Sequence, residues 1–135
     1  MILCGPGRAA VEFAGAGLPL HVWDGHAVTR IQGDRRRVGY RGTRTDAPWT
    51  RHTVALTEQT RLYLVTDGLL DQSGGEKGFG FGEERLGGLI SECGSLPMRQ
   101  QETAFRTSIA AWQGARAQRD DLTVFGLWPG RAHRA

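Results

Sequence analysis

The segment from Arg61 to Gln72 (RLYLVTDGLLDQ) constrains the fold of this 135-residue chain most strongly. Its apolar run from Leu62 to Val65 leads directly into Thr66-Asp67-Gly68. A continuous apolar run that ends at a turn signal is typical of a strand buried on both faces. We therefore expect a rigid central strand that presents Asp67 at its end on an Asp-Gly turn, where a carboxylate suits a metal ion. The dipeptide alone more often forms a simple hairpin turn.

A second acidic feature, Asp120-Asp121, opens the last apolar segment of the chain, Leu122 to Trp128. Adjacent aspartates repel each other, and bringing them near a third carboxylate is costly unless cations neutralise the charge. Hard divalent ions such as Mg²⁺ and Mn²⁺ prefer carboxylate and water oxygens as ligands. We therefore expect residues 62–66 and 122–127 to be neighbouring buried strands that bring Asp67 and Asp120 together.

A third segment, the glycine-containing strand FAGAGLPLHV at residues 13–22, precedes these two features. The three motifs in this order resemble those of the SpoIIE-like branch of the metal-dependent (PPM) protein serine/threonine phosphatases. The resemblance extends from Val11 to Trp128, which is nearly the whole chain. It implies an α+β fold, a partial PPM-type α/β sandwich of antiparallel sheets with a flanking antiparallel helix pair.

The resemblance also implies which residues bind metal. Asp67 and Asp120 would be metal ligands, and Gly68 and Asp121 would be auxiliary to them. The complete family domain uses two Mn²⁺ or Mg²⁺ ions, and no catalytic residue beyond the metal ligands is identified here. Asp71 lies four residues beyond Asp67, and we expect it to face solvent in a loop rather than to support the metal site.

One motif of the family is missing from its expected place. The family carries an earlier Asp-x-x-Gly-His-Gly motif, with further acidic ligands, ahead of the glycine-containing strand. The segment Trp23-Asp24-Gly25-His26 looks similar, but it follows that strand, and we expect a hairpin turn there. We therefore interpret residues 1–128 as a partial phosphatase domain that lacks the N-terminal metal motif, and residues 129–135 as a flexible tail.

Two helices are expected between the two acidic motifs. Residues 83–93 carry apolar side chains at helical spacing, and Gly94 ends that helix. Ser95 can cap the next helix, and Pro97 is tolerated in its first turn. The stripe of this second helix that faces the core consists of Met98, Phe105, Ile109 and Trp112.

Three further expectations concern the segments around these elements. Leu18 to Trp23 alternates apolar and less apolar side chains, which predicts a half-buried strand. Residues 38–40 are expected to form a further short strand. Phe79 and Phe81 lie in a glycine-rich connector, and we expect both to pack onto the core.

Composition excludes several other classes of protein. The chain is 39% hydrophobic and 23% charged, which is ordinary for a soluble domain. Its net charge of +3 and the run Arg35-Arg36-Arg37 invite nucleic-acid binding, but no nucleic-acid-binding motif accompanies them, so we predict no such partner. No apolar run approaches the roughly 20 residues that span a bilayer, and no signal peptide is recognised. We predict a cytoplasmic protein without membrane contact, whose Cys4 and Cys93 are reduced.

The activity implied by the resemblance is hydrolysis of a phosphoserine or phosphothreonine ester by a water that bridges two metal ions. Substrates in this branch are commonly small phosphorylated regulators of the anti-sigma-factor-antagonist kind. Because two carboxylates hold divalent ions weakly, we expect the chain as written to be inactive or incomplete. The alternatives are a non-catalytic remnant that binds a partner through its helix pair and a fragment of a longer reading frame. We also expect self-association, since strands without partners expose apolar faces and backbone polar groups.

Overall fold

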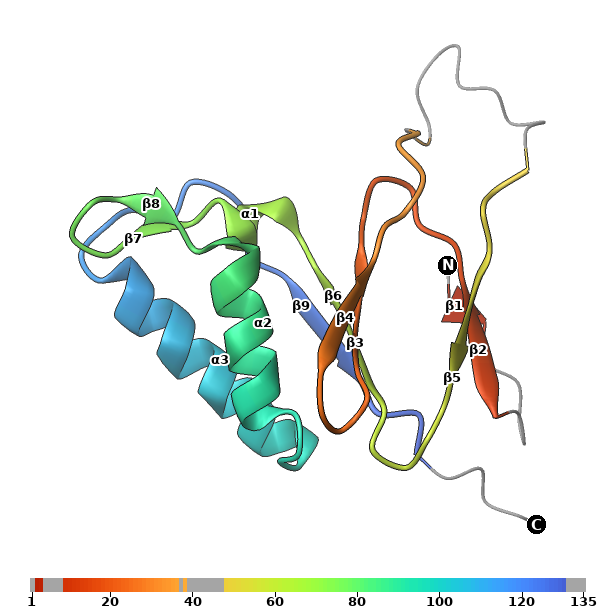
Figure 1. Ribbon diagram of the computed structural model, residues 1–135. Helices are drawn as coiled ribbons and strands as arrows, with labels where there is room; N and C mark the ends of the chain where they lie inside the picture. Colours follow the sequence, from red (N-terminus) through yellow and green to blue (C-terminus); the bar gives the residue numbers. More distant parts are fainter. Residues whose placement is uncertain (1, 4–8, 37, 39–47, 131–135) are drawn as a thin grey trace.

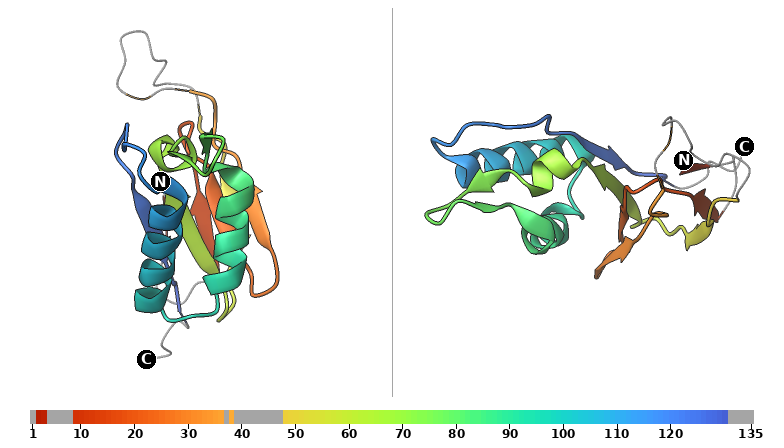
Figure 2. Two further views of the ribbon diagram at one scale, coloured as in Figure 1. Left: turned by 90° about the vertical axis from the view of Figure 1, so that its left-hand side faces the viewer. Right: turned by 90° about the horizontal axis from the view of Figure 1, so that it is seen from above.

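The computed structural model describes residues 2–3, 9–36, 38 and 48–130, and these form three layers (Figure 1). A helix layer covers one face of a central sheet, and a second sheet packs against the opposite face. Figure 2 shows the same layers from two further directions. The strand expected at residues 38–40, apart from Val38, and the tail beyond Gly130 lie outside the described residues. Within the described part, no helix has the length and apolar character needed to cross a bilayer.

Two antiparallel sheets form the sandwich in the described part of the chain. The first has the strand order β1-β2-β5, with β1 (Ile2–Leu3), β2 (Ala10–Phe13) and β5 (His52–Ala55). The second has the order β4-β3-β6-β9, with β3 (Leu20–Trp23), β4 (Val28–Ile31), β6 (Arg61–Val65) and β9 (Val124–Leu127). A small hairpin of β7 (Ser73–Gly74) and β8 (Phe79–Gly80) lies beside the helices (Figure 1). The expected α+β sandwich of antiparallel sheets is confirmed.

Strand β6 lies in the interior of the second sheet, as its continuous apolar sequence predicts. Leu62 is 1% exposed and belongs to the core between the two sheets. Tyr63 is also 1% exposed and belongs to the core under the helices. Because successive side chains of a strand point to opposite faces, these neighbours enter two different cores. This double burial explains why the strand is apolar throughout, and each such side chain contributes roughly 2 kcal/mol to folding.

Strand β9 pairs with β6 as predicted, with Val65 opposite Val124. The prediction that this strand is buried is wrong, because β9 is an outer strand of its sheet and none of its residues is fully buried. Val124 and Leu127 pack only partly against the two cores, and Phe125 is 52% exposed. An outer strand has a neighbour on one side only, so side chains at its margin are covered less than those of β6.

Strand β3 is buried on both faces, so the half-buried prediction is also wrong. Leu20 and Val22 face the other sheet, as the alternation suggests. His21 and Trp23 point to the opposite face and are 2% and 6% exposed. The helix layer covers that face, where Trp23 joins the core under the helices.

The segment around Asp24 forms the expected hairpin turn between β3 and β4. The backbone N–H of Asp24 donates to the carbonyl of Ala27 at 3.2 Å. Its carboxylate accepts the N–H groups of His26 and Ala27, each at 2.8 Å, and Gly25 adopts a φ of +106°, which suits glycine. The Ala27 and His26 N–H groups lower the pKa of Asp24 by stabilising its charged form. This carboxylate is therefore part of the turn.

Helices α2 (Gly82–Cys93) and α3 (Met98–Gln113) run in opposite directions across the second sheet (Figure 1). Gly94 follows the last residue of α2, as predicted. The prediction that Ser95 caps α3 is wrong. Pro97 occupies the position before α3 in an extended conformation, and no side-chain cap is formed there. Proline has a fixed φ that is compatible with a helix start.

The two connector phenylalanines differ in environment. Phe81, which directly precedes α2, is 2% exposed and packs in the core under the helices, as expected. Phe79 is 65% exposed, so the prediction that it packs onto the core is wrong. It lies in β8, where the β7–β8 hairpin extends away from the helix–sheet interface (Figure 1).

Candidate metal centre

The two candidate ligands lie at the same end of the β6–β9 pair. Asp67 follows β6 and begins the one-turn helix α1 (Asp67–Leu70). The Asp-Gly dipeptide therefore starts a helix, and the turn expected there is not observed. Asp120 lies shortly before β9, and the Val65–Val124 pairing brings the residues that follow β6 next to those that precede β9. Both aspartates are solvent exposed.

Hydrogen bonds connect the two segments beyond the end of the ladder. The backbone N–H of Thr66 donates to the carbonyl of Thr123 at 3.1 Å. The Thr66 hydroxyl donates to the carbonyl of Asp121 at 3.0 Å and accepts the N–H of Thr123 at 3.0 Å. The residue that precedes Asp67 is thus bonded to the residue that follows Asp120.

Gly68 provides a second contact between these segments. A Cβ atom built on Gly68 would lie 2.5 Å from the carbonyl oxygen of Asp121 and 3.1 Å from the Cβ of Asp120. The first distance is shorter than real Cβ contacts and the second is unusually tight, so a side chain at this position would require a backbone shift and glycine fits without one. The predicted auxiliary residues Gly68 and Asp121 therefore touch each other through backbone atoms, and the residues around Asp67 and Asp120 are in direct contact.

The donor atoms at this end of the sheet are carboxylate oxygens. Oδ1 of Asp67 accepts the N–H of Gly68 at 3.0 Å, and Oδ1 of Asp120 accepts the N–H of Asp121 at 2.7 Å. Such local bonds limit the rotation of each carboxylate. In the described part of the chain, no group of three or more His, Cys, Asp or Glu residues is arranged to hold a metal ion. Carboxylate oxygens are the type of ligand that a hydrated Mg²⁺ or Mn²⁺ ion prefers. Two carboxylates, however, are few for such a site.

Asp71 ends helix α1, where its backbone N–H donates to the carbonyl of Asp67 at 2.8 Å. Its side chain is exposed to solvent, as expected. Asp71 therefore has the same type of side chain as Asp67 and lies at the end of the same short helix, which makes it a matched control for substitutions at Asp67.

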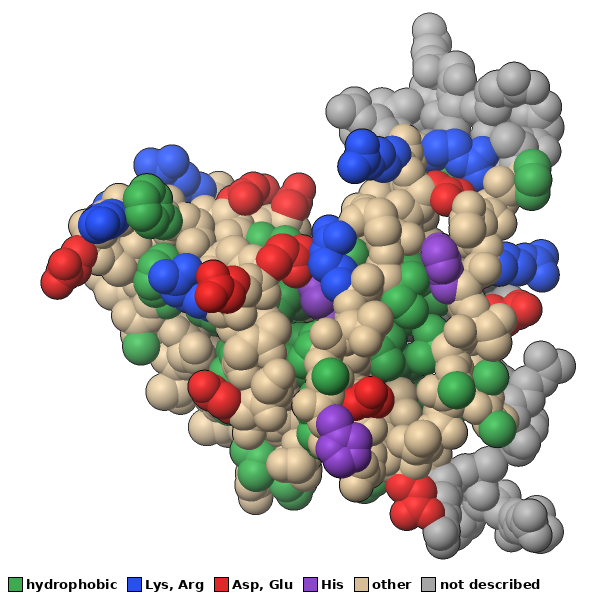
Figure 3. Space-filling view, in the orientation of Figure 1, with side chains coloured by type: hydrophobic (Ala, Val, Ile, Leu, Met, Phe, Trp, Pro, Cys, Tyr) green, Lys and Arg blue, Asp and Glu red, His purple; other side chains and the backbone are tan. Residues whose placement is uncertain are grey.

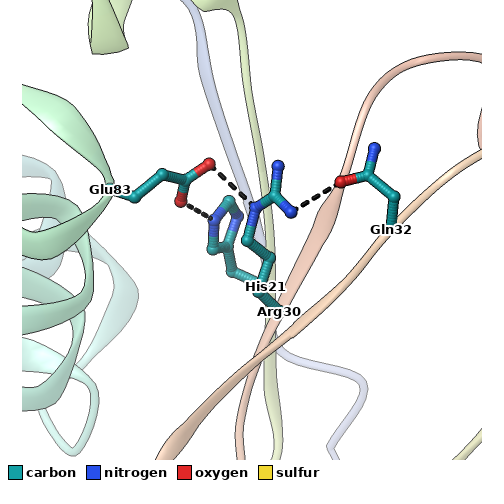
Figure 4. A network of polar contacts seen from close by, with 4 residues as sticks. All are labelled: His21, Arg30, Gln32 and Glu83. Carbon is teal, nitrogen blue, oxygen red and sulfur yellow. Dashed lines mark hydrogen bonds and ion pairs between the residues drawn. The ribbon is translucent and has the colours of Figure 1, made fainter.

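A polar network that sequence reasoning missed connects α2 to the second sheet (Figure 4). Glu83 in the first turn of α2 accepts hydrogen bonds from Nε2 of His21 at 2.7 Å and Nε of Arg30 at 2.9 Å. Arg30 also donates to Oε1 of Gln32 at 2.6 Å. Partial burial raises the pKa of Glu83, but the hydrogen bonds and charges of His21 and Arg30 outweigh it and hold that pKa below its ordinary value.

A groove of about 1140 Å³ lies between α3 and the outer strand β9. Its lining includes apolar side chains from both elements, among them Phe105 and Phe125, and charged side chains along α3, among them Glu102 and Arg106. In Figure 3, hydrophobic side chains can be seen in the hollow between the two sheets on the face turned to the viewer. Apolar surface therefore remains accessible on the described part of the molecule.

The antiparallel sandwich with its helix pair defines the PPM-type, PP2C-like class of phosphatase fold. The chain belongs to the SpoIIE family, because the model of the family described as Stage II sporulation protein E (SpoIIE) matches residues 1–127. Among solved structures, the SiaA-PP2C domain of Pseudomonas aeruginosa is similar, with 37% sequence identity and a TM-score of 0.78. The match covers 88% of this chain and 46% of that chain, so this chain spans less than half of the length of the SiaA-PP2C chain. No curated protein matches the chain.

Proposed function

We propose that this chain contributes the Asp67–Asp120 carboxylate pair to a metal-dependent protein serine/threonine phosphatase site. The observation that carries the proposal is the close packing of Gly68 against Asp120 and Asp121, with a built Cβ only 3.1 Å from the Cβ of Asp120. Gly68 directly follows Asp67 in the sequence and packs against Asp120 itself. The two carboxylates are therefore carried by neighbouring segments, which supports a shared site. Membership of the SpoIIE family supports the class of reaction.

In this proposal Asp67 and Asp120 hold Mn²⁺ or Mg²⁺ through carboxylate oxygens. When bound, such ions lower the pKa of a water and neutralise charge on phosphoryl oxygens. The chain's own part is to orient the two carboxylates. The N–H groups of Gly68 and Asp121 each bond one carboxylate oxygen, so the second oxygen of each side chain remains available to a cation. Gly68 and Asp121 are auxiliary in this sense.

We propose that the chain by itself binds divalent ions weakly and turns over substrate slowly. Hard cations take six or more oxygen ligands, and each absent carboxylate removes both charge and geometric constraint. The substrate in this proposal is a cytoplasmic phosphoserine or phosphothreonine regulator of the anti-sigma-factor-antagonist kind. A non-catalytic, partner-binding remnant is the second candidate, favoured by the lack of a three-ligand cluster among the described residues.

Mn²⁺ binding and phosphopeptide hydrolysis by the purified chain test these proposals together. We expect weak Mn²⁺ binding that is lost in Asp67→Asn and retained in Asp71→Asn, with hydrolysis close to the rate without protein. Binding that is equal in both variants would contradict the site and support the remnant. Metal-dependent hydrolysis that Asp67→Asn abolishes would show instead that the chain acquires its further ligands elsewhere, for example from a second copy.

A further inference from the structure

We propose that Thr66 and Gly68 are positioning residues that set the separation of Asp67 and Asp120. Thr66 holds the two segments together by hydrogen bonds, and Gly68, which has no side chain, allows them to approach closely. The proposal rests on the proposed metal site. It assigns a role to the two residues that flank Asp67 in the sequence. Thr66 is hydrogen-bonded to Asp121 and Thr123, and Gly68 packs against Asp120 and Asp121.

Thr66 lies just beyond the last paired residues of the sheet, where its hydroxyl makes hydrogen bonds that the strand ladder no longer provides. The β6–β9 ladder ends with the Val65–Val124 pair, and residues 117–123 form no helix or strand. Beyond this pair, the backbone N–H of Thr66 donates to the carbonyl of Thr123. The hydroxyl adds a donated bond to Asp121 and an accepted bond from Thr123. Among the described residues, one side chain therefore supplies two of the three bonds between this segment and Thr66 at the end of β6.

These bonds act on the residues next to the carboxylates. Thr66 precedes Asp67, and the carbonyl that it bonds belongs to Asp121, which follows Asp120. Each hydrogen bond contributes about 1 kcal/mol to the local structure, and a metal site requires its ligands within about 0.5 Å of the productive geometry. Loss of the hydroxyl should therefore loosen the segment that carries Asp120 while leaving most of the folded core in place.

Gly68 acts through space and not through backbone conformation. Its φ is not in the left-handed region, so an alanine could adopt the same backbone. The added Cβ would meet the Asp121 carbonyl at 2.5 Å and the Asp120 Cβ at 3.1 Å. Because the nearest of these atoms is backbone, the segments would have to separate. Gly68→Ala therefore widens the pair while every hydrogen-bonding group remains in the chain, whereas Thr66→Val removes the hydroxyl that makes two of the bonds.

The test compares Mn²⁺ affinity, measured by electron paramagnetic resonance on the purified chain, across four variants. Thr66→Val keeps the shape but removes the hydroxyl, Thr66→Ser keeps the hydroxyl, and Gly68→Ala adds the Cβ. Thr123→Val is the matched control, because the described bonds of Thr123 use its backbone. Residues that orient metal ligands typically change affinity by about 10- to 100-fold. We expect a loss of about tenfold in Thr66→Val and Gly68→Ala, and affinity within about twofold of the parent chain in Thr66→Ser and Thr123→Val.

Thermal unfolding without metal separates positioning from folding. Should Thr66→Val fail to fold, the comparison of Gly68→Ala with the parent chain decides the question. If Thr66→Val folds and binds Mn²⁺ as tightly as the parent chain, the positioning role is overturned and the proposed metal site stands. If Thr66→Val does not fold, parent-like Mn²⁺ affinity of folded Gly68→Ala overturns the positioning role in the same way. A parent chain that binds no more Mn²⁺ than Asp67→Asn would instead overturn the proposed function, and the positioning role with it.

Discussion

Oε2 of Glu83 lies 2.7 Å from Nε2 of His21, so the first turn of α2 is bonded directly to the buried strand β3. His21 is 2% exposed, whereas the Glu83 side chain is 40% exposed. Arg30 on the adjacent strand β4 contacts the same carboxylate at 2.9 Å. Three elements thus meet at one charged group at the margin of the helix–sheet interface (Figure 4).

Glu83→Gln should reduce stability at neutral pH, by about 0.5 kcal/mol after solvent screening is allowed for. The folded-state pKa of Glu83 lies below its ordinary value of 4.5. Its contribution is therefore present above pH 4.5 and is lost as the pH falls through the folded-state pKa. Urea unfolding at several pH values measures this difference. Glu84→Gln, in the same helical turn, is the control, and an equal effect of both substitutions would contradict the role of the network.

Tyr63→Phe should destabilise the chain by about 1 to 3 kcal/mol, because it leaves a buried acceptor without its donor. The Tyr63 hydroxyl donates to Oε1 of Gln101 at 2.7 Å, and both residues are at most 2% exposed. Burial raises the pKa of Tyr63, so the hydroxyl remains a donor over the working pH range. The free energy of unfolding in urea measures the cost. A change below about 0.3 kcal/mol would show that this bond adds little to the helix–sheet contact.

Phe125→Ser should reduce self-association of the chain. Phe125 is 52% exposed on the outer strand β9 and lines the groove beside α3, and exposed apolar surface on the outer strand of a sheet favours contact between copies. Sedimentation velocity at several protein concentrations measures the association. Phe79→Ser is the matched control, since Phe79 is 65% exposed on the distant β7–β8 hairpin. A parent chain that stays monomeric at high concentration would contradict the prediction.

The sequence predicted the parts of the fold that depend on local pattern. The apolar run of β6 and the helical spacing in α2 each identify an element from its own residues. The order of the acidic motifs, together with the family resemblance, predicted that β6 and β9 are neighbours. Strand position was less predictable. The apolar sequence of β9 predicts a buried strand, although β9 is an edge strand of its sheet.

The parts that the sequence did not predict depend on contacts between residues far apart in the chain. Thr66 and Asp121 are 55 residues apart, and His21 and Glu83 are 62 residues apart. Neither pair has a local signal, because a threonine hydroxyl and an exposed glutamate each have many available partners. The space requirement at Gly68 is similar, since it arises only when the segment of Asp120 packs against α1.

A double-mutant cycle of Mn²⁺ affinity with Asp67→Asn, Asp120→Asn and both together tests the central claim most directly. Two carboxylates that hold the same ion are coupled, so the loss from the double substitution should be much smaller than the sum of the two single losses. We predict that each single substitution removes most of the binding and that the second adds little. Strictly additive losses, or affinity unchanged by either substitution, would contradict the assignment of Asp67 and Asp120 to one metal site.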